Sequence, residues 1–198
     1  MTSGPPLLAV LTGPSAVGKD SVLARLRELL PGAHLTITAT TRAPRARERD
    51  GVDYYFYSVS EFEAMIERGE LLEHARVYGD WKGVPKAPIL AALRAGRDVL
   101  MRTDVQGARY IQSAFPGAVT IFINPPSVAE LERRLRHRAA DDAEQARVRM
   151  KIASEEMAGA REFDHTVVND DLERCAREIA AILERERLSP DREAVVVD

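Results

Sequence analysis

A short segment near the start of the chain has the residue types and spacing of a phosphate-binding loop. Its residues match the first seven positions of the pattern G-x-x-x-x-G-K-[ST], and they are Gly13, Pro14, Ser15, Ala16, Val17, Gly18 and Lys19. Glycines let backbone N–H groups turn inward around phosphate oxygens, and the N-terminus of a following helix adds partial positive charge. Lys19 would reach the β- and γ-phosphates. The segment therefore predicts an ATP-binding loop.

The eighth position departs from this pattern. Asp20 stands where a Ser or Thr hydroxyl normally binds Mg²⁺, and Ser21 comes one residue too late, roughly 100° around the helix. We expect Mg²⁺ to bind together with ATP. Our hypothesis is that the carboxylate of Asp20 takes over the metal contact, directly or through water.

A polar loop at residues 40–53 indicates a second anion pocket. Arg42 and Arg45 lie three residues apart there, and Pro44 stiffens the segment between them. Two guanidinium groups held in this way suit a phosphate monoester. A kinase needs such an acceptor pocket, whereas a nucleotide hydrolase needs residues that position water. Taken alone, however, the loop fits a solvated basic surface equally well.

The elements that must position these residues alternate between strands and helices. Apolar runs predict buried strands at residues 7–12, 35–38, 98–103, 118–123 and 166–168. Amphipathic patterns predict helices at 19–30, from 88 onward, and at 105–113, 127–138, 142–161 and 171–187. This alternation predicts an α/β fold with a mostly parallel sheet and helices on both faces.

Residues 40–86 interrupt that alternation with several short elements. Strands are predicted at 54–57 and 71–78, and Ser60 and Glu63 have the spacing of a capping box for a helix between them. We interpret this stretch as an insertion that reaches over the ligand cleft.

The composition narrows the class of protein further. A formal net charge of −3 gives no general signal for nucleic acid or an anionic membrane, so we expect neither as a partner. The single cysteine, Cys175, lies on an apolar helical stripe, which predicts a buried core thiol. The N-terminus lacks a basic leader, and no apolar stretch is long enough to span a bilayer, so we expect a cytoplasmic protein. The sequence does not indicate an oligomeric state.

Longer motifs resemble the guanylate kinase family. The runs at residues 40–45 (TTRAPR) and 50–56 (DGVDYYF) are similar to the GMP-binding segment of that family. Further similar runs follow in order at residues 71–73, 78–85, 104–108, 125–127 and 167–171. The resemblance extends from about Leu8 to Leu183.

This resemblance implies a P-loop nucleoside monophosphate kinase that transfers the γ-phosphoryl group of ATP to GMP, and we expect also to dGMP, in purine nucleotide metabolism. It implies a single domain over residues 1–198. The expected parts are a core at about 5–35, 87–133 and 150–187, a GMP-binding subdomain at about 36–86, a mobile lid at about 134–149 and a loose tail at 188–198.

The resemblance also implies how GMP is bound. Arg42, Arg45 and Tyr54 would bind its phosphate, and Lys82 stands where the family usually has a tyrosine that contacts the same group. An ammonium could still donate a hydrogen bond there.

For the base, the resemblance implies that Glu73 and Asp104 accept hydrogen bonds from guanine N1–H and the 2-amino group, while Thr38 offers its hydroxyl. Adenine lacks those donors, and buried carboxylates left unpaired can reject it by a factor on the order of 10⁴. Without the resemblance, Glu73 would be interpreted as a surface charge and Asp104 as a helix cap.

On the donor side, Arg138 and Arg149 match the two ATP-facing arginines of the lid, and Asn169 matches a residue beside the adenine ring. The expected catalytic groups are Lys19, Arg42, Arg138 and Arg149. They would align the substrates and neutralise charge, with no dedicated general base, because the acceptor phosphate is itself largely dianionic.

Three further departures from the family leave alternatives open. Arg102 occupies a usually acidic position near the metal, and we expect it to pair with Asp20 or a phosphate. Lys82 replaces a tyrosine, and residues 138–141 (RAAD) replace Arg-Gly-Thr-Glu. The segment 18–21 (GKDS) also resembles ribose 1,5-bisphosphate phosphokinases, and a catalytically inactive guanylate-kinase-like binding module is a third interpretation.

Overall fold

A five-stranded parallel sheet forms the centre of the protein. The computed structural model describes residues 4–77, 79–138, 143–190 and 192–197. The strands of this sheet lie in the order β2 (His34–Leu35), β7 (Val99–Arg102), β1 (Leu8–Thr12), β8 (Val119–Asn124) and β9 (His165–Val168). All four neighbouring pairs are parallel. The predicted α/β class is confirmed.

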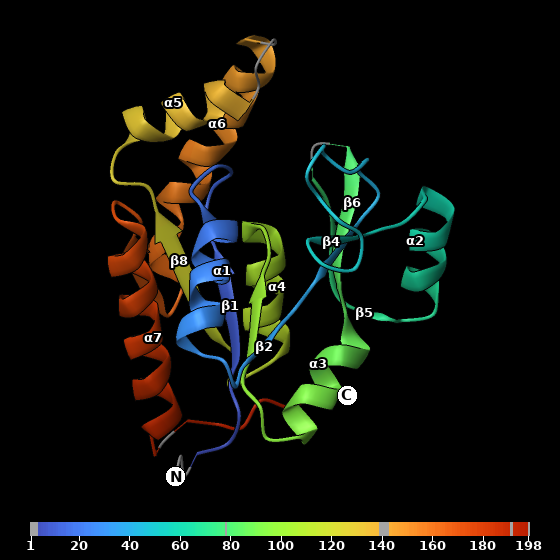
Figure 1. Ribbon diagram of the computed structural model, residues 1–198, viewed down its shortest axis with the longest axis vertical. Helices are drawn as coiled ribbons and strands as arrows, with labels where there is room; N and C mark the ends of the chain where they lie inside the picture. Colours follow the sequence, from blue (N-terminus) through green and yellow to red (C-terminus); the bar gives the residue numbers. More distant parts are fainter. Residues whose placement is uncertain (1–3, 78, 139–142, 191, 198) are drawn as a thin grey trace.

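Helices cover both faces of this sheet. Helices α1 (Lys19–Leu29) and α7 (Leu172–Leu188) pack on one face, and α3 (Lys86–Arg94) and α4 (Val105–Ala114) pack on the other. Figure 1 shows α1 and α7 side by side along β1. Because both faces are buried, the strands are continuous apolar runs instead of alternating ones.

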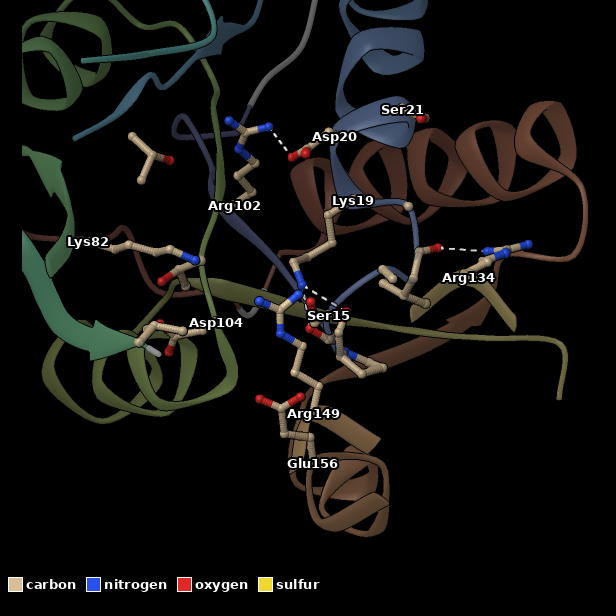
Figure 2. A pocket seen from close by; sticks show the side chains of 18 of the residues that line it. Ser15, Lys19, Asp20, Ser21, Lys82, Arg102, Asp104, Arg134, Arg149 and Glu156 are labelled. Atoms are coloured by element: carbon tan, nitrogen blue, oxygen red, sulfur yellow. Dashed lines mark hydrogen bonds and ion pairs between the residues drawn. The ribbon is translucent and has the colours of Figure 1, made fainter. Parts of the chain in front are cut away.

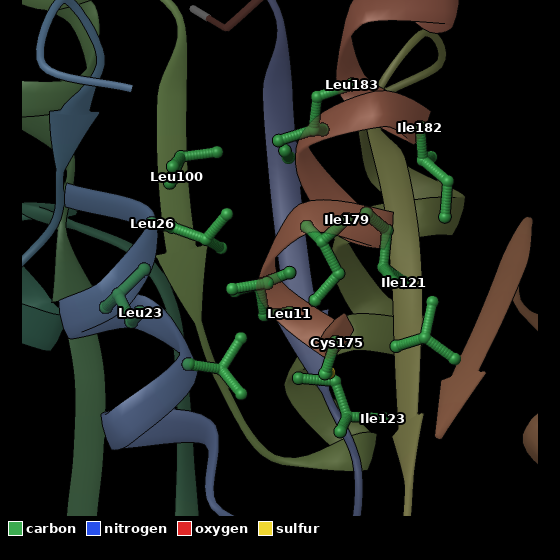
Figure 3. Packing of buried hydrophobic residues seen from close by; sticks show 14 of the residues in the cluster. Leu11, Leu23, Leu26, Leu100, Ile121, Ile123, Cys175, Ile179, Ile182 and Leu183 are labelled. Atoms are coloured by element: carbon green, nitrogen blue, oxygen red, sulfur yellow. The ribbon is translucent and has the colours of Figure 1, made fainter. Parts of the chain in front are cut away.

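The packing of the first face includes the single cysteine. Cys175 lies among Leu11, Ile123 and Ile179, with no exposed surface (Figure 3). Burial raises the pKa of its thiol to about 11, which keeps it protonated and unreactive near neutral pH. The prediction of a buried core thiol is confirmed.

A second, smaller sheet stands beside the core, on the right in Figure 1. Its strands lie in the order β4 (Tyr54–Phe56), β3 (Thr38–Thr40), β6 (Asp80–Pro85) and β5 (Leu71–Val77). With α2 (Val59–Glu67) it has its own small apolar core around Phe62 and Met65. It coincides with the predicted insertion.

Two local predictions in this region were wrong. The single strand expected at residues 35–38 is two strands, β2 in the main sheet and β3 in the second one. The capping box of α2 is formed by Ser58 and Glu61, two residues earlier than expected.

Two helices project beyond the sheet at the top of Figure 1, α5 (Val128–Arg138) and α6 (Ala143–Ala158). A short 3₁₀ turn at Ala160–Glu162 follows α6. They pack on each other through Leu131, Leu135 and Ala153. The expected lid at 134–149 falls on these two helices. Of the unusual lid segment, Ala139, Ala140 and Asp141 lie outside the described residues.

The C-terminal segment has no regular structure at residues 192–197, as expected, but it is not loose there. Val195 and Val197 pack against the core cluster to which α3 and α4 contribute. Arg192 also donates to the backbone carbonyls of Pro5 and Gly117. The valines of the tail cover apolar core surface, which the sequence prediction did not consider.

Among the described helices, none combines the length and apolarity needed to cross a bilayer.

Candidate active site

A cleft of about 600 Å³ opens between the main sheet, the second sheet and α6. The predicted site residues that line it are Gly13, Pro14, Ser15, Ala16, Val17, Gly18, Lys19, Asp20, Thr38, Arg42, Arg45, Tyr54, Glu73, Lys82, Asp104 and Arg149. Asn169 lies behind the loop instead of in the cleft wall. Arg138 ends α5, and its side chain is outside the part of the chain that the structure describes.

The loop between β1 and α1 has the geometry of a phosphate cradle. Gly13 and Gly18 have φ values of 136° and 103°, a left-handed region that favours glycine. A Cβ on Gly18 would lie 2.5 Å from the amide nitrogen of Asn169, which donates a hydrogen bond of 2.8 Å to the carbonyl of Val17. Asn169 therefore holds the loop from behind.

Lys19 lies at the centre of the cleft, with its ammonium over the loop. It donates to the backbone carbonyls of Gly13 and Pro14, the latter at 3.1 Å (Figure 2). Enclosure in the cleft lowers the pKa of Lys19, whereas the carboxylates of Glu156 and Asp20 act in the opposite direction. A bound phosphate would favour the charged ammonium in the same way.

The two arginines of the second anion pocket converge on a carboxylate of their own loop. Arg42 donates to Glu48 at 2.9 Å, and the backbone N–H of Arg45 donates to Glu48 at 2.8 Å. Burial opposes ionisation of Glu48, but these hydrogen bonds prevail and lower its pKa. The guanidinium carbon of Arg42 also lies 5.3 Å from the centre of the Tyr54 ring. The loop is thus ordered around its own anion.

The expected base pocket contains a deeply buried acid. Glu73 on β5 is only 3% exposed, and its Oε1 accepts a hydrogen bond of 2.8 Å from the hydroxyl of Thr103. Burial, with a smaller effect from Asp104, raises the pKa of Glu73 to about 8. The Thr38 hydroxyl of the same pocket is buried and has no hydrogen-bond partner among the described residues. Glu73 is therefore not the surface charge that sequence reasoning alone favoured.

Asp104 serves as a helix cap and also lines the cleft. Its Oδ1 accepts the backbone N–H of Gly107 at 2.9 Å, in the first turn of α4. Gly107 is required by packing, because a Cβ there would lie 2.3 Å from the Thr103 hydroxyl and 2.6 Å from Glu73 Oε2. The family-like run at 104–108 thus lets α4 approach the buried acid.

The expected pairing of Arg102 with Asp20 is present. The two side chains form an ion pair at the entrance to the phosphate loop, marked by a dashed line in Figure 2. A second nitrogen of Arg102 donates to the carbonyl of Asp53 at 2.9 Å.

Sequence reasoning did not single out Glu156 on α6, an acid that lines the cleft. Its side chain is half-buried, and one carboxyl oxygen is buried with no hydrogen-bond partner in the part of the chain that the structure describes. Burial raises the pKa of Glu156. Figure 2 shows it with Arg149 on the side of Lys19 away from the Asp20–Arg102 pair. The spacing of Arg149, Ala153 and Glu156 places all three on one helix face, which was the available signal.

The fold and this cleft define a P-loop nucleoside monophosphate kinase. The family model for guanylate kinase matches residues 6–186. The guanylate kinase of Carboxydothermus hydrogenoformans is 42% identical over 94% of this chain and 91% of its own length. The guanylate kinase of Thermosynechococcus vestitus is 48% identical over 87% of this chain and 91% of its own length. The chain belongs to the guanylate kinase family.

A solved structure agrees with that assignment. The crystal structure of guanylate kinase from Anaplasma phagocytophilum superimposes with a TM-score of 0.81 at 32% sequence identity. The match covers 96% of this chain and 90% of that one. The similarity therefore includes the main sheet and the second sheet together.

Proposed function

We propose that this chain transfers the γ-phosphoryl group of ATP to GMP, and to dGMP, giving ADP and GDP or dGDP. The observation that carries the proposal is the buried acid Glu73 in the same cleft as the phosphate loop. Family membership supports the same reaction. An acceptor base with adjacent N–H donors would add hydrogen bonds to the one that Glu73 accepts from Thr103, and so favour its carboxylate in a buried site.

Guanine would be recognised by three groups of the base pocket. Glu73, which would lose its proton when guanine binds, and Asp104 would accept from N1–H and the 2-amino group, and the hydroxyl of Thr38 would bond to the base. Adenine presents an acceptor in place of N1–H and has no 2-amino group, so it would leave the carboxylates unpaired. Rejection by about 10⁴ is typical of such sites.

The acceptor phosphate would bind at Arg42, Arg45, Tyr54 and Lys82, which line one side of the cleft. Two guanidinium forks and an ammonium suit a dianionic monoester. One oxygen of that phosphate would attack the γ-phosphorus in line, and the bond to the β–γ bridging oxygen would break, with ADP as leaving group. A dianionic nucleophile makes a general base unnecessary.

The donor phosphates would lie in the loop at residues 13–19, with Lys19 on the β- and γ-phosphates. Arg149, which lines the cleft from α6, and Arg138 would neutralise charge on the transferring group. Asn169, which supports the loop, would lie near the adenine ring. We keep the assignment of Arg138 on the resemblance alone.

The described residues fit Mg²⁺ bound mainly through the phosphates of ATP. They contain no cluster of three or more acidic, His or Cys ligands, and Mg²⁺ needs only one or two carboxylates beside phosphate oxygens and water. Asp20 follows the loop directly and would hold the ion, directly or through water. Mg²⁺ would neutralise charge on the β- and γ-phosphates.

The test is a coupled assay of ADP release with ATP and Mg²⁺, offering GMP, dGMP, AMP and ribose 1,5-bisphosphate as acceptors. We expect rapid turnover with GMP and dGMP, little with AMP, and none when Mg²⁺ is withheld. Turnover with ribose 1,5-bisphosphate but not GMP would overturn the proposal in favour of the sugar phosphate kinase. An absence of ADP release with all four acceptors would favour the catalytically inactive binding module.

A further inference from the structure

Arg102 connects the ATP-binding side of the cleft to the acceptor side. It stands at the end of β7 in the main sheet, and its first terminal nitrogen pairs with Asp20 in the first turn of α1. Its second terminal nitrogen donates to the carbonyl of Asp53 at 2.9 Å, and its guanidinium carbon lies 4.7 Å from the centre of the Tyr54 ring. The Arg102 side chain thus contacts α1 on the donor side and the start of β4 on the acceptor side.

The two partners of the ion pair differ in burial. The side chain of Arg102 is 13% exposed, whereas that of Asp20 is 51% exposed. Removing the partner of an enclosed charge is costly because the remaining charge has lost its compensation. Loss of Asp20 therefore leaves the enclosed guanidinium without its compensating charge, and it would act by releasing Arg102 from its present position.

Tyr54 links the position of the Arg102 guanidinium to the acceptor pocket. Its ring lies near two guanidiniums, that of Arg42 at 5.3 Å and that of Arg102 at 4.7 Å. Both are within the range of a cation–π contact. Arg102 also holds the carbonyl of Asp53, the residue directly before Tyr54. The orientation of the phenol therefore depends on where the Arg102 side chain is held.

We propose that Arg102 is a positioning residue for the acceptor phosphate, and that Asp20, on the donor side, strengthens acceptor binding through Arg102 and Tyr54. The inference rests on the proposed function, because GMP is the ligand that reports on the pocket. It goes beyond that function by giving Asp20 a role that needs neither ATP nor metal.

The experiment measures GMP binding by calorimetry in the presence of EDTA and without ATP. The variants are Asp20→Asn, which is nearly isosteric, Arg102→Met, and both together. We expect Arg102→Met to weaken GMP binding about tenfold and Asp20→Asn about threefold to fivefold. The double variant should match Arg102→Met alone, because Asp20 acts through Arg102. Guanosine, which lacks the phosphate, should bind all of them equally.

A matched control is Arg68→Met, which removes an arginine paired with the exposed Glu70 on the same subdomain. It should leave GMP binding unchanged. Urea unfolding of each variant identifies any loss of GMP binding that follows from unfolding alone.

Three results would overturn the inference. Tighter GMP binding by Asp20→Asn would mean that Arg102 contacts the phosphate directly and that Asp20 competes for it. Unchanged binding by Asp20→Asn would limit Asp20 to the donor side. Equal losses for GMP and guanosine would show a merely structural role. If the unaltered protein fails to bind GMP, the proposed function falls; if it binds GMP and the variants bind equally, only this inference falls.

Discussion

Replacing Glu73 with Gln is expected to stabilise the ligand-free protein at neutral pH while removing its activity toward GMP. The carboxyl is 3% exposed, and burial raises its pKa to about 8 from an ordinary value of 4.5. A glutamine has nearly the same shape, can accept the same hydrogen bond from Thr103, and carries no charge. Stability and acceptor recognition therefore make opposite demands on this position.

The magnitude follows from the two pKa values. The folded chain holds the Glu73 proton more tightly than the unfolded chain, so the stabilisation is complete below pH 4.5 and is lost as the pH rises through about 8. The loss approaches about 1.4 kcal/mol per pH unit between the two values. From pH 5 to pH 7 the free energy of unfolding should fall by on the order of 2 kcal/mol through this group alone.

Urea unfolding at pH 5, 6 and 7 without nucleotide tests this reasoning. The difference in the free energy of unfolding between Glu73→Gln and the unaltered protein should grow with pH in favour of the variant. Glu67→Gln, a change at an exposed position on α2, is the control and should show no such trend. Parallel pH profiles for Glu73→Gln and the unaltered protein would refute the buried, protonated carboxyl. Turnover with GMP should fall by at least about 10² in the same variant.

Two further predictions concern other residues of the cleft. Gly107→Ala would place a Cβ 2.6 Å from the Glu73 carboxylate, so it should destabilise the protein by about 1–3 kcal/mol and raise the KM for GMP. The control is Gly32→Ala, where no atom lies within 4 Å of the new Cβ. Urea unfolding and steady-state kinetics should show neither effect for this control. Glu156→Gln should tighten ATP binding several-fold at pH 8 but little at pH 6, because the raised pKa leaves the wild-type carboxylate to compete for Lys19 only at the higher pH. Equal ATP affinities for the variant and the unaltered protein at pH 8 would contradict that competition.

The main sheet and the phosphate loop could be predicted from sequence because their signals are local. β1 and β8 are apolar at nearly every position, as strands buried on both faces must be, and the glycines of the loop stand between a strand and a helix. The division of residues 34–40 between two sheets could not be predicted, since Thr36 and Ile37 carry no signal for a change of sheet. That decision is made by tertiary pairing.

Residue patterns alone misplaced the capping box and failed to indicate the burial of Glu73, for different reasons. Ser58 with Glu61 and Ser60 with Glu63 satisfy the same spacing, and the choice depends on where β4 ends. Glu73 is buried directly after Leu71 and Leu72, and this run of three breaks the alternation expected of a strand. A register shift in the pairing with β6 accompanies it. Bulges of this kind re-aim a side chain, and alternation alone gives no warning of them.

The carboxylate of Glu48 sets a minimum negative charge that a ligand of the acceptor pocket must carry. Because Glu48 already occupies Arg42 and the backbone N–H of Arg45, an incoming ligand must displace one negative charge before it gains those two hydrogen bonds. A monoanion such as chloride or acetate offers those donors no more than Glu48 does, whereas a phosphate dianion offers twice the charge and three oxygens. The pocket can therefore stay well ordered in a cell full of small anions without being filled by them.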